Sequence, residues 1–225
     1  MTKTVAITAI VLVAVVMGIS TIAPTLQQAF ASADDTICVG SISGTHDNVV
    51  VPSGSVCTFS STTINGDLKV ESAASLFASS STINGNIEAD GANFILLVSV
   101  TVGGDVQIEK SSGGFVNIND LSVGGDLKIT EKSSGSFVQV AGSSIGGDLQ
   151  MEENSGSFVR AFGNTVGGNL EFNQNTTTGT FAPMVVATNT VAGDLKCEDN
   201  SPAPNLSGLG ANIVTGDKEG QCAGL

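Results

Sequence analysis

Apolar and polar positions follow a block that returns about every twenty residues along this chain. Each block reads as an apolar residue, a small residue, Gly, Asp or Asn, and a second apolar residue. The blocks begin at Ile64, Ile83, Val102, Val123, Ile145, Val166 and Val191. One such unit cannot bury its own apolar face, so self-similarity at this period is typical of a stacked repeat array.

Residues on the C-terminal side of each Gly alternate with a period of two, which indicates a β-strand. The position two residues after Gly is always apolar, and the next inward position is two residues further on. The first of these rows is Leu68, Ile87, Val106, Leu127, Leu149, Leu170 and Leu195. The positions between the two rows are mostly charged, amide or hydroxyl residues, so the pattern predicts a sheet with one dry and one wet face.

A second apolar segment follows in each repeat after a Ser-, Gly- and Thr-rich turn. It begins with Phe94, Phe115, Phe137, Phe158 and Phe181 in successive repeats. The spacing of these residues matches the spacing of the Gly blocks, so we expect the rings to stack above one another. A regular aromatic row of this kind is typical of a core, and we expect it to be core rather than a platform for a ligand.

Successive block glycines lie 19 to 25 residues apart, enough for two or three short strands and their corners. The predicted fold class is therefore all-β: a single-stranded parallel β-helix, or β-solenoid, of about 8–9 coils spaced about 4.8 Å apart. The variable coil length argues against a strict left-handed hexapeptide helix, and we expect a right-handed solenoid. Frequent β-branched residues and the lack of helical periodicity count against leucine-rich or helical repeats.

The middle Gly of each block is predicted to be a structural corner residue. Only hydrogen in place of a side chain fits a tight corner or a positive φ without strain. The predicted corner glycines are Gly66, Gly85, Gly104, Gly125, Gly147, Gly168 and Gly193.

The start of the chain has the pattern of a secretory signal peptide. Lys3 precedes an apolar run, and Ala31-Ser32-Ala33 is a small-x-small cleavage site. We favour cleavage over a permanent membrane anchor. The predicted organisation is therefore a signal peptide at 1–33 and one β-solenoid domain at 34–225, with an N-terminal cap at 34–60, repeat coils at 61–196 and a C-terminal cap at 197–225. The expected location is extracellular or in the cell envelope, with no membrane-spanning segment in the mature chain.

The four cysteines lie near the two ends of the expected mature chain, outside the central repeats. Four cysteines allow three pairings, and the pairs Cys38 with Cys57 and Cys197 with Cys222 close the shortest loops. Disulfides closing loops of this size each stabilise by roughly 3 kcal/mol. We expect them to clasp the terminal coils, and their spacing does not resemble a zinc site.

Acidic residues dominate the charge of the chain, with 21 Asp and Glu against 8 Lys and Arg and a formal net charge of −13. This charge disfavours nucleic acid and anionic membranes as partners. Two acidic rows are expected on the wet face, and clustered carboxylates attract divalent cations such as calcium. The candidate metal ligands in these rows are Asp67, Glu71, Asp105, Glu109, Asp148 and Glu152. We favour the alternative that each Asp or Asn caps its own turn and that the rest of the face maintains solubility, so no cofactor is expected.

The sequence offers few residues for catalysis. His46 is the only histidine, Arg160 is the only arginine, and the chain has no Trp or Tyr. Polysaccharide lyases and hydrolases occur on parallel β-helices, but a fold alone does not establish an activity. We therefore assign no catalytic residue.

The block pattern and the ends of the chain resemble a group of uncharacterised exported β-solenoid repeat proteins of actinobacteria and archaea. The likeness covers Val49 to Cys57, the Val-Gly-Gly-Asp-Leu coils, and the segment from Cys197 to Leu225. The coil pattern is also similar to that of bactofilins, which are polymer-forming β-solenoid scaffolds. Bactofilins are cytosolic and lack the signal and the cysteines of this chain, and neither resemblance implies a catalytic residue.

These observations favour a non-catalytic secreted or cell-envelope protein with a structural or interaction role. The alternatives are a glycan-binding or polysaccharide-cleaving β-helix and a surface protein that binds divalent cations. The expected partner is a protein or glycan surface, and we expect a monomer, with end-to-end assembly through the terminal strand edges as the alternative. Two glycosylation sequons begin at Asn175 and Asn205.

Overall fold

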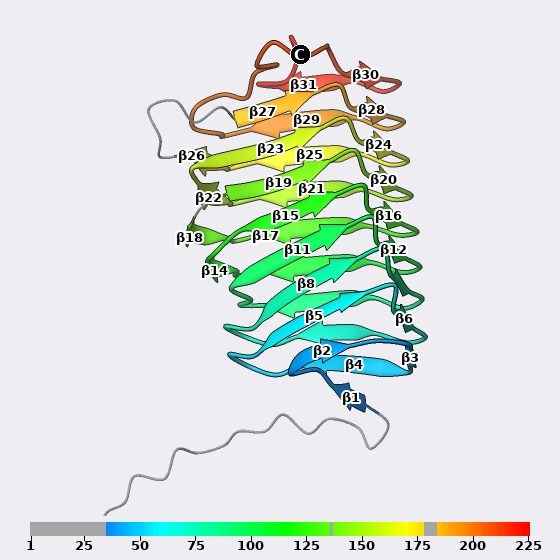
Figure 1. Cartoon of the computed structure of the whole chain (residues 1–225). Helices are drawn as coiled ribbons and strands as arrows, with labels where there is room; N and C mark the ends of the chain where they lie inside the picture. The colour runs from blue at the N-terminus through cyan, green and yellow to red at the C-terminus, as the bar shows by residue number, and fades with distance from the viewer. Residues whose placement is uncertain (1–34, 136, 178–183) are drawn as a thin grey trace, which may run out of the picture. The chain divides into compact units, whose positions relative to one another are not determined.

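The computed structural model describes residues 35–135, 137–177 and 184–225. These residues form a parallel β-solenoid of about eight turns, which confirms the predicted fold class. Figure 1 shows the coils stacked in chain order, with the strands of each sheet above one another. The predicted signal peptide and Phe181 lie outside the described residues. The right-handed sense stays a prediction.

Sheet A is the longest of the three main sheets and has ten strands. Its strands are β1 (Asp35–Ile37), β4 (Asn48–Val51), β7 (Leu68–Val70), β10 (Ile87–Asp90), β13 (Val106–Glu109), β17 (Leu127–Thr130), β21 (Leu149–Glu152), β25 (Leu170–Asn173), β29 (Leu195–Glu198) and β31 (Lys218–Gly220). This sheet contains the strands predicted on the C-terminal side of each block glycine.

Sheet B contains the second predicted segment of each repeat and has eight strands. They are β2 (Gly40–Ile42), β5 (Val56–Ser60), β8 (Ser75–Ser79), β11 (Phe94–Val98), β15 (Val116–Asn119), β19 (Phe137–Ala141), β23 (Phe158–Phe162) and β27 (Met184–Ala187).

Sheet C consists of nine two-residue strands on the third face of the solenoid. They are β3 (Thr45–His46), β6 (Thr63–Ile64), β9 (Thr82–Ile83), β12 (Thr101–Val102), β16 (Ser122–Val123), β20 (Ser144–Ile145), β24 (Thr165–Val166), β28 (Thr190–Val191) and β30 (Ile213–Val214). Each strand after β3 pairs in parallel and in register with the strand one coil before it, so the first residues of β3 to β28 form an outward row of Thr and Ser.

The longer coils in the second half of the solenoid form extra short strands between sheets A and B. These are β14 (Ser112–Gly113) paired with β18 (Ser133–Gly135), and β22 (Ser155–Gly156) paired with β26 (Thr176–Thr177). They lie at the corner on the left of Figure 1. The Ser- and Gly-rich turns of the sequence therefore become a local extension of that corner.

Apolar side chains from all three sheets fill the interior. Leu127, Leu149 and Leu170 are all fully buried and pair directly with one another in β17, β21 and β25. The predicted inward rows are confirmed, because parallel in-register pairing stacks like residues and buries each against its neighbours.

The Phe row stacks as predicted, but the expectation that it belongs to the core was wrong. The ring centroids of Phe115 and Phe137 are 5.2 Å apart, and those of Phe137 and Phe158 are 4.6 Å apart. All three rings are half-buried on the outer side of sheet B, because the β-branched residue after each Phe takes the inward position. Each Phe and the β-branched residue that follows it are both apolar, so the alternation of apolar and polar residues did not identify which of the two faces the core.

The disulfides pair as predicted, Cys38 with Cys57 and Cys197 with Cys222. Their Cα–Cα distances are 5.5 and 5.2 Å, and all four residues are fully buried. Each bond links two neighbouring coils near one end of the solenoid. The segment predicted as an N-terminal cap, 34–60, contributes β1 to β5 to the three sheets and is itself coiled.

Candidate functional site

The repeated Asp and Asn after each block glycine form a hydrogen-bonded ladder between coils. In each step the side-chain Oδ1 accepts a hydrogen bond from the backbone N–H of the equivalent residue in the next coil. Asp67 accepts from Asn86 at 2.8 Å, and Asp105 accepts from Asp126 at 2.9 Å. The same bond continues from Asn48 through Asp67, Asn86, Asp105, Asp126, Asp148, Asn169 and Asp194 to Asp217.

This geometry corrects the predicted capping role of the Asp and Asn side chains. We expected each to bond within its own turn, but each one satisfies a donor of the following coil. A carboxylate that accepts a backbone N–H forms a charge-assisted bond, which offsets the repulsion between carboxylates stacked one coil apart. The acidic row is therefore an element of the coil-to-coil contact.

The block glycines are required by this ladder. A Cβ built on Gly147 would lie 2.0 Å from the Asp126 Oδ1, and one on Gly125 would lie 1.9 Å from the Asp105 Oδ1. None of the seven predicted corner glycines has a positive φ. Their requirement comes from the close approach of the preceding coil, and the positive-φ explanation was wrong. The left-handed residues lie instead at the other two corners, as at Ser80 and Lys110.

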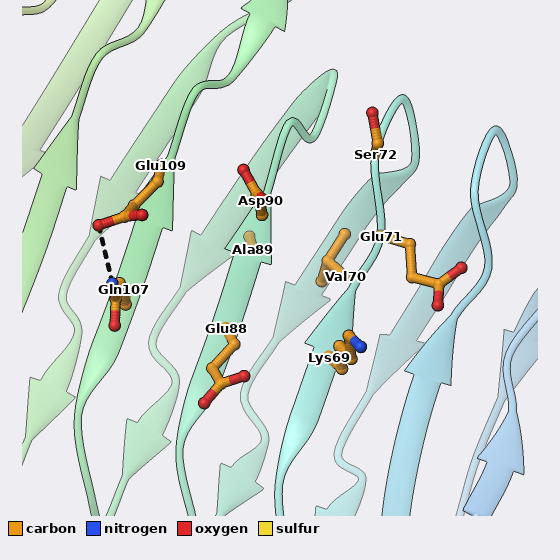
Figure 2. Close-up of a pocket in the computed structure, with 9 residues that line it drawn as sticks. All are labelled: Lys69, Val70, Glu71, Ser72, Glu88, Ala89, Asp90, Gln107 and Glu109. Carbon is orange, nitrogen blue, oxygen red and sulfur yellow. Dashed lines mark hydrogen bonds between the residues drawn. The ribbon is translucent and has the colours of Figure 1, made fainter. Parts of the chain in front are cut away.

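The second acidic row lies four positions after the Asp and Asn ladder and includes Glu71, Asp90, Glu109 and Glu152. It borders a hollow of about 390 Å³ on the outer face of sheet A. Figure 2 shows its lining along three neighbouring strands, where Glu88 lies between its register partners Lys69 and Gln107. The charged and amide residues around the hollow are Lys69, Glu71, Glu88, Asp90, Gln107 and Glu109. The hollow is thus predominantly acidic and open to solvent.

Glu109 is the carboxylate in this row that is held most firmly. Its side chain accepts hydrogen bonds from the Gln107 Nε2 at 2.7 Å and from the Lys128 Nζ at 3.1 Å. These bonds, that of Gln107 first, lower the pKa of Glu109 below its usual range. Glu109 is therefore ionised and oriented, which suits charge pairing rather than proton donation.

A second acidic cluster lies further along sheet A. Burial raises the pKa of Glu171, and the nearby carboxylates of Glu152 and Asp148 raise it further. The Asn173 Nδ2 donates to the Glu152 Oε1 at 3.0 Å. Like charges one coil apart disfavour ionisation of the more buried carboxyl group. The electrostatic repulsion within this cluster therefore acts mainly against the ionised form of Glu171.

The predicted metal ligands are distributed along the two rows. Within residues 35–135, 137–177 and 184–225, no three Asp, Glu, His or Cys side chains converge as a cation-binding group. One oxygen of Asp67, of Asp105 and of Asp148 already accepts a backbone hydrogen bond. Calcium binding stays the untested alternative, and at these three residues it would have to use the remaining carboxylate oxygens.

Two further ladders, both buried, were missed by the sequence analysis. One contains Asn154, Asn175 and Asn200, and the other contains Asn164, Asn189 and Asn212. The Asn175 Nδ2 donates to the Met151 carbonyl at 2.8 Å, and its Oδ1 accepts from the Asn154 backbone N–H at 3.1 Å. The recurrence of Asn at these positions was the available signal, but it begins only midway along the array.

The two residues that are unique of their kind lie apart. The His46 ring contacts the Thr36 hydroxyl at 3.2 Å and the Ser43 carbonyl at 3.1 Å, in the first coil. The Arg160 guanidinium lies over the Phe158 ring, 4.1 Å from its centroid, on sheet B. The structure therefore does not bring His46 and Arg160 into one site.

Comparisons with protein-family models, curated proteins and solved structures found no match. Among the described residues there is no helix with the length and apolar character needed to cross a membrane. The resemblance to exported repeat proteins and to bactofilins stays a prediction.

Proposed function

We propose that this chain is a non-catalytic structural and interaction protein of the cell exterior, built as a β-solenoid. The observation that carries the proposal is the Asp and Asn ladder, in which the most regular polar residues of the surface bind the next coil. Side chains used in this way stabilise the stack instead of facing a substrate. Two buried disulfides are typical of an oxidising, extracellular compartment and support the location.

The polar interior contacts also support a structural role. Buried Asn side chains bond both to carbonyls of the preceding coil and to the Asn of the following coil, as at Asn189. Such bonds leave few buried groups unsatisfied and make each coil depend on its neighbours. The product is a stack whose outer faces are held in fixed register.

An assay for product release tests the proposal. The exported chain is incubated with acidic and neutral polysaccharides, and reducing ends and unsaturated products are measured. We expect no release above that of a heat-unfolded sample. Release that is lost in Glu71→Gln or Glu88→Gln, but kept in the exposed sheet C variant Thr101→Ser, would overturn the non-catalytic assignment.

The acidic hollow on sheet A favours a second candidate, a glycan-binding surface. Its volume is large enough for a sugar unit, and Lys69, Glu88 and Gln107 offer donors and acceptors on adjacent strands. Titration of neutral oligosaccharides into the wild type and Glu88→Ala would test it. Heat or a shift of amide resonances seen only with the wild type would support this candidate.

A further inference from the structure

The outer face of sheet B differs from that of sheet A in its charge. The described strands of this sheet contain no Asp, Glu or Lys, and Arg160 is their one charged residue. The whole chain has a net charge of −13, and sheet A presents its carboxylates to solvent. Sheet B is therefore a wide face that a second acidic molecule can approach without placing carboxylates against carboxylates.

Apolar side chains gather on this neutral face over β8 and β11. Phe77 and Leu96 are register partners on the outer side, and Val98 lies one outward position further along β11. All three are half-buried, and they border a shallow hollow of about 280 Å³ that reaches back to Thr58 and Ser60. At β27, by contrast, all four residues are buried. The hollow thus lies over the first half of the sheet, from β2 to β11.

Polar residues surround this patch along the solenoid axis. Thr58 and Ser60 precede Phe77 and Ser79 in the same two columns, and Asn117 and Asn119 follow Leu96 and Val98. The Asn119 Nδ2 donates to the Asn117 Oδ1 at 2.9 Å. An apolar centre with a hydroxyl and amide rim is the composition of a protein–protein interface.

The geometry of the Phe row favours protein over glycan on this face. Sugars bind the faces of aromatic rings, but Phe115, Phe137 and Phe158 stack on one another and present their edges. The Arg160 guanidinium lies over the Phe158 ring. The exposed edges suit apolar side chains of another protein chain.

We infer that the outer face of sheet B binds a second copy of this chain, in a dimer with a two-fold axis between β8 and β11. This inference rests on the proposed role as an interaction protein. A two-fold axis there places Phe77 of one copy on Leu96 of the other, and it places Thr58 opposite Asn117. Apolar residues then meet at the centre and polar residues meet at the rim, so the patch is self-complementary.

The size of the face sets the expected strength of the dimer. An axis between β8 and β11 brings the six strands from β2 to β19 into the contact, three on each side of the axis. Six strands spaced about 4.8 Å apart and about 17 Å long give on the order of 500 Å² of sheet per partner. Interfaces of this size are at the small end of specific complexes, and their dissociation constants are on the order of micromolar. The inferred weak dimer departs from the monomer expected from the sequence, which stays a prediction.

Light scattering after size exclusion tests the inference, over concentrations from about 1 to a few hundred micromolar. We expect the wild type to move from the monomer mass to twice that mass. Leu96→Glu adds a carboxylate at the centre and should raise the dissociation constant roughly tenfold or more. The matched control Thr101→Glu adds the same charge on the outer face of sheet C and should dimerise as the wild type does. Phe77→Thr is the second variant, for the case that Leu96→Glu does not fold. It also removes an apolar side chain at the centre, and Thr already occupies the neighbouring position of the same column at Thr58, so the fold should be kept.

A wild type that stays monomeric at every concentration would overturn the inference, as would binding of that monomer to lipid vesicles. A dimer that both Leu96→Glu and Phe77→Thr leave intact, or any mass above two copies, would also overturn it. These outcomes leave the proposed non-catalytic structural role standing. Product release from a polysaccharide would instead overturn that role and leave the dimer untouched.

Discussion

The Asp126 Oδ1 accepts a hydrogen bond from the backbone N–H of Asp148 at 2.8 Å, one coil further along the chain. This bond joins two acidic residues that would otherwise only repel each other. Asn86 and Asn169 make the same contact at other steps of the ladder, so the contact requires the side-chain oxygen and not the charge. Stability measurements can separate these two properties.

We predict that Asp126→Ala lowers the free energy of unfolding by about 1–2 kcal/mol, because the Asp148 N–H loses its acceptor. Asp126→Asn retains an acceptor oxygen and should cost less than about 0.5 kcal/mol. Denaturant unfolding followed by circular dichroism measures both. Equal losses in the two variants would contradict a role for the oxygen.

A second prediction concerns the glycine that lies beneath this bond. Gly147→Ala would place a Cβ 2.0 Å from the Asp126 Oδ1, so we expect a loss of about 2–3 kcal/mol. In an Asp126→Gly background the oxygen is absent and the loss should fall by about 1 kcal/mol or more. Gly224→Ala, where a Cβ meets nothing within 4 Å, is the control and should leave the thermal midpoint unchanged. Additive losses in the double variant would contradict the close-approach explanation.

The two glycosylation sequons are expected to behave differently. Asn175 is fully buried and its Nδ2 donates to the Met151 carbonyl, whereas Asn205 is exposed. In a host that glycosylates exported proteins, the folded chain should therefore carry any N-linked glycan on Asn205 and none on Asn175. Mass spectrometry of proteolytic peptides measures this, with Asn205→Gln as the control that should remove the modification. A folded chain glycosylated on Asn175 would contradict the buried ladder.

The raised pKa of Glu171 predicts a pH-dependent stability. A folded-state pKa above the unfolded value means that the folded chain binds more protons between the two, so stability falls as pH rises through that window. Glu171→Gln removes the penalty and should raise the thermal midpoint at neutral pH. The gain should vanish below the unfolded pKa of about 4.3, where the wild-type side chain is protonated in both states.

The comparison that isolates this effect is Glu153→Gln, because Glu153 is an exposed glutamate and the substitution is the same. Thermal scans of the three proteins at several pH values give the result. A midpoint gain for Glu171→Gln that is the same at acid and neutral pH would rule out titration as the cause.

Calcium titration tests the cation hypothesis. Because one oxygen of each ladder Asp before Asp217 accepts a backbone N–H, we expect no binding heat and no shift in the thermal midpoint on adding millimolar calcium or a chelator. Saturable heat that disappears in Glu71→Gln and Glu109→Gln would establish the second acidic row as a cation site.

Much of the architecture could be read from the pattern of residues. The period of the Gly blocks predicted parallel coils, the alternation after each Gly predicted the inward Leu rows, and the positions of the cysteines predicted both disulfides. Each of these features depends on local spacing. Stacked identical residues remain in contact whatever the exact corner geometry, so a repeat transmits its local pattern directly to the fold.

The sequence by itself determined that this chain stacks, which rows face inward and where the ends are clasped. Only the tertiary structure decided which of two adjacent apolar residues faces solvent in sheet B, and it placed Phe137 outside and Val138 inside. It also showed that Asp126 and Gly147, 21 residues apart in the sequence, approach across a coil boundary. Such contacts depend on register between coils, which a period alone does not specify. The neutral, apolar face of sheet B depends on the same register, because it forms only when eight separate strands align.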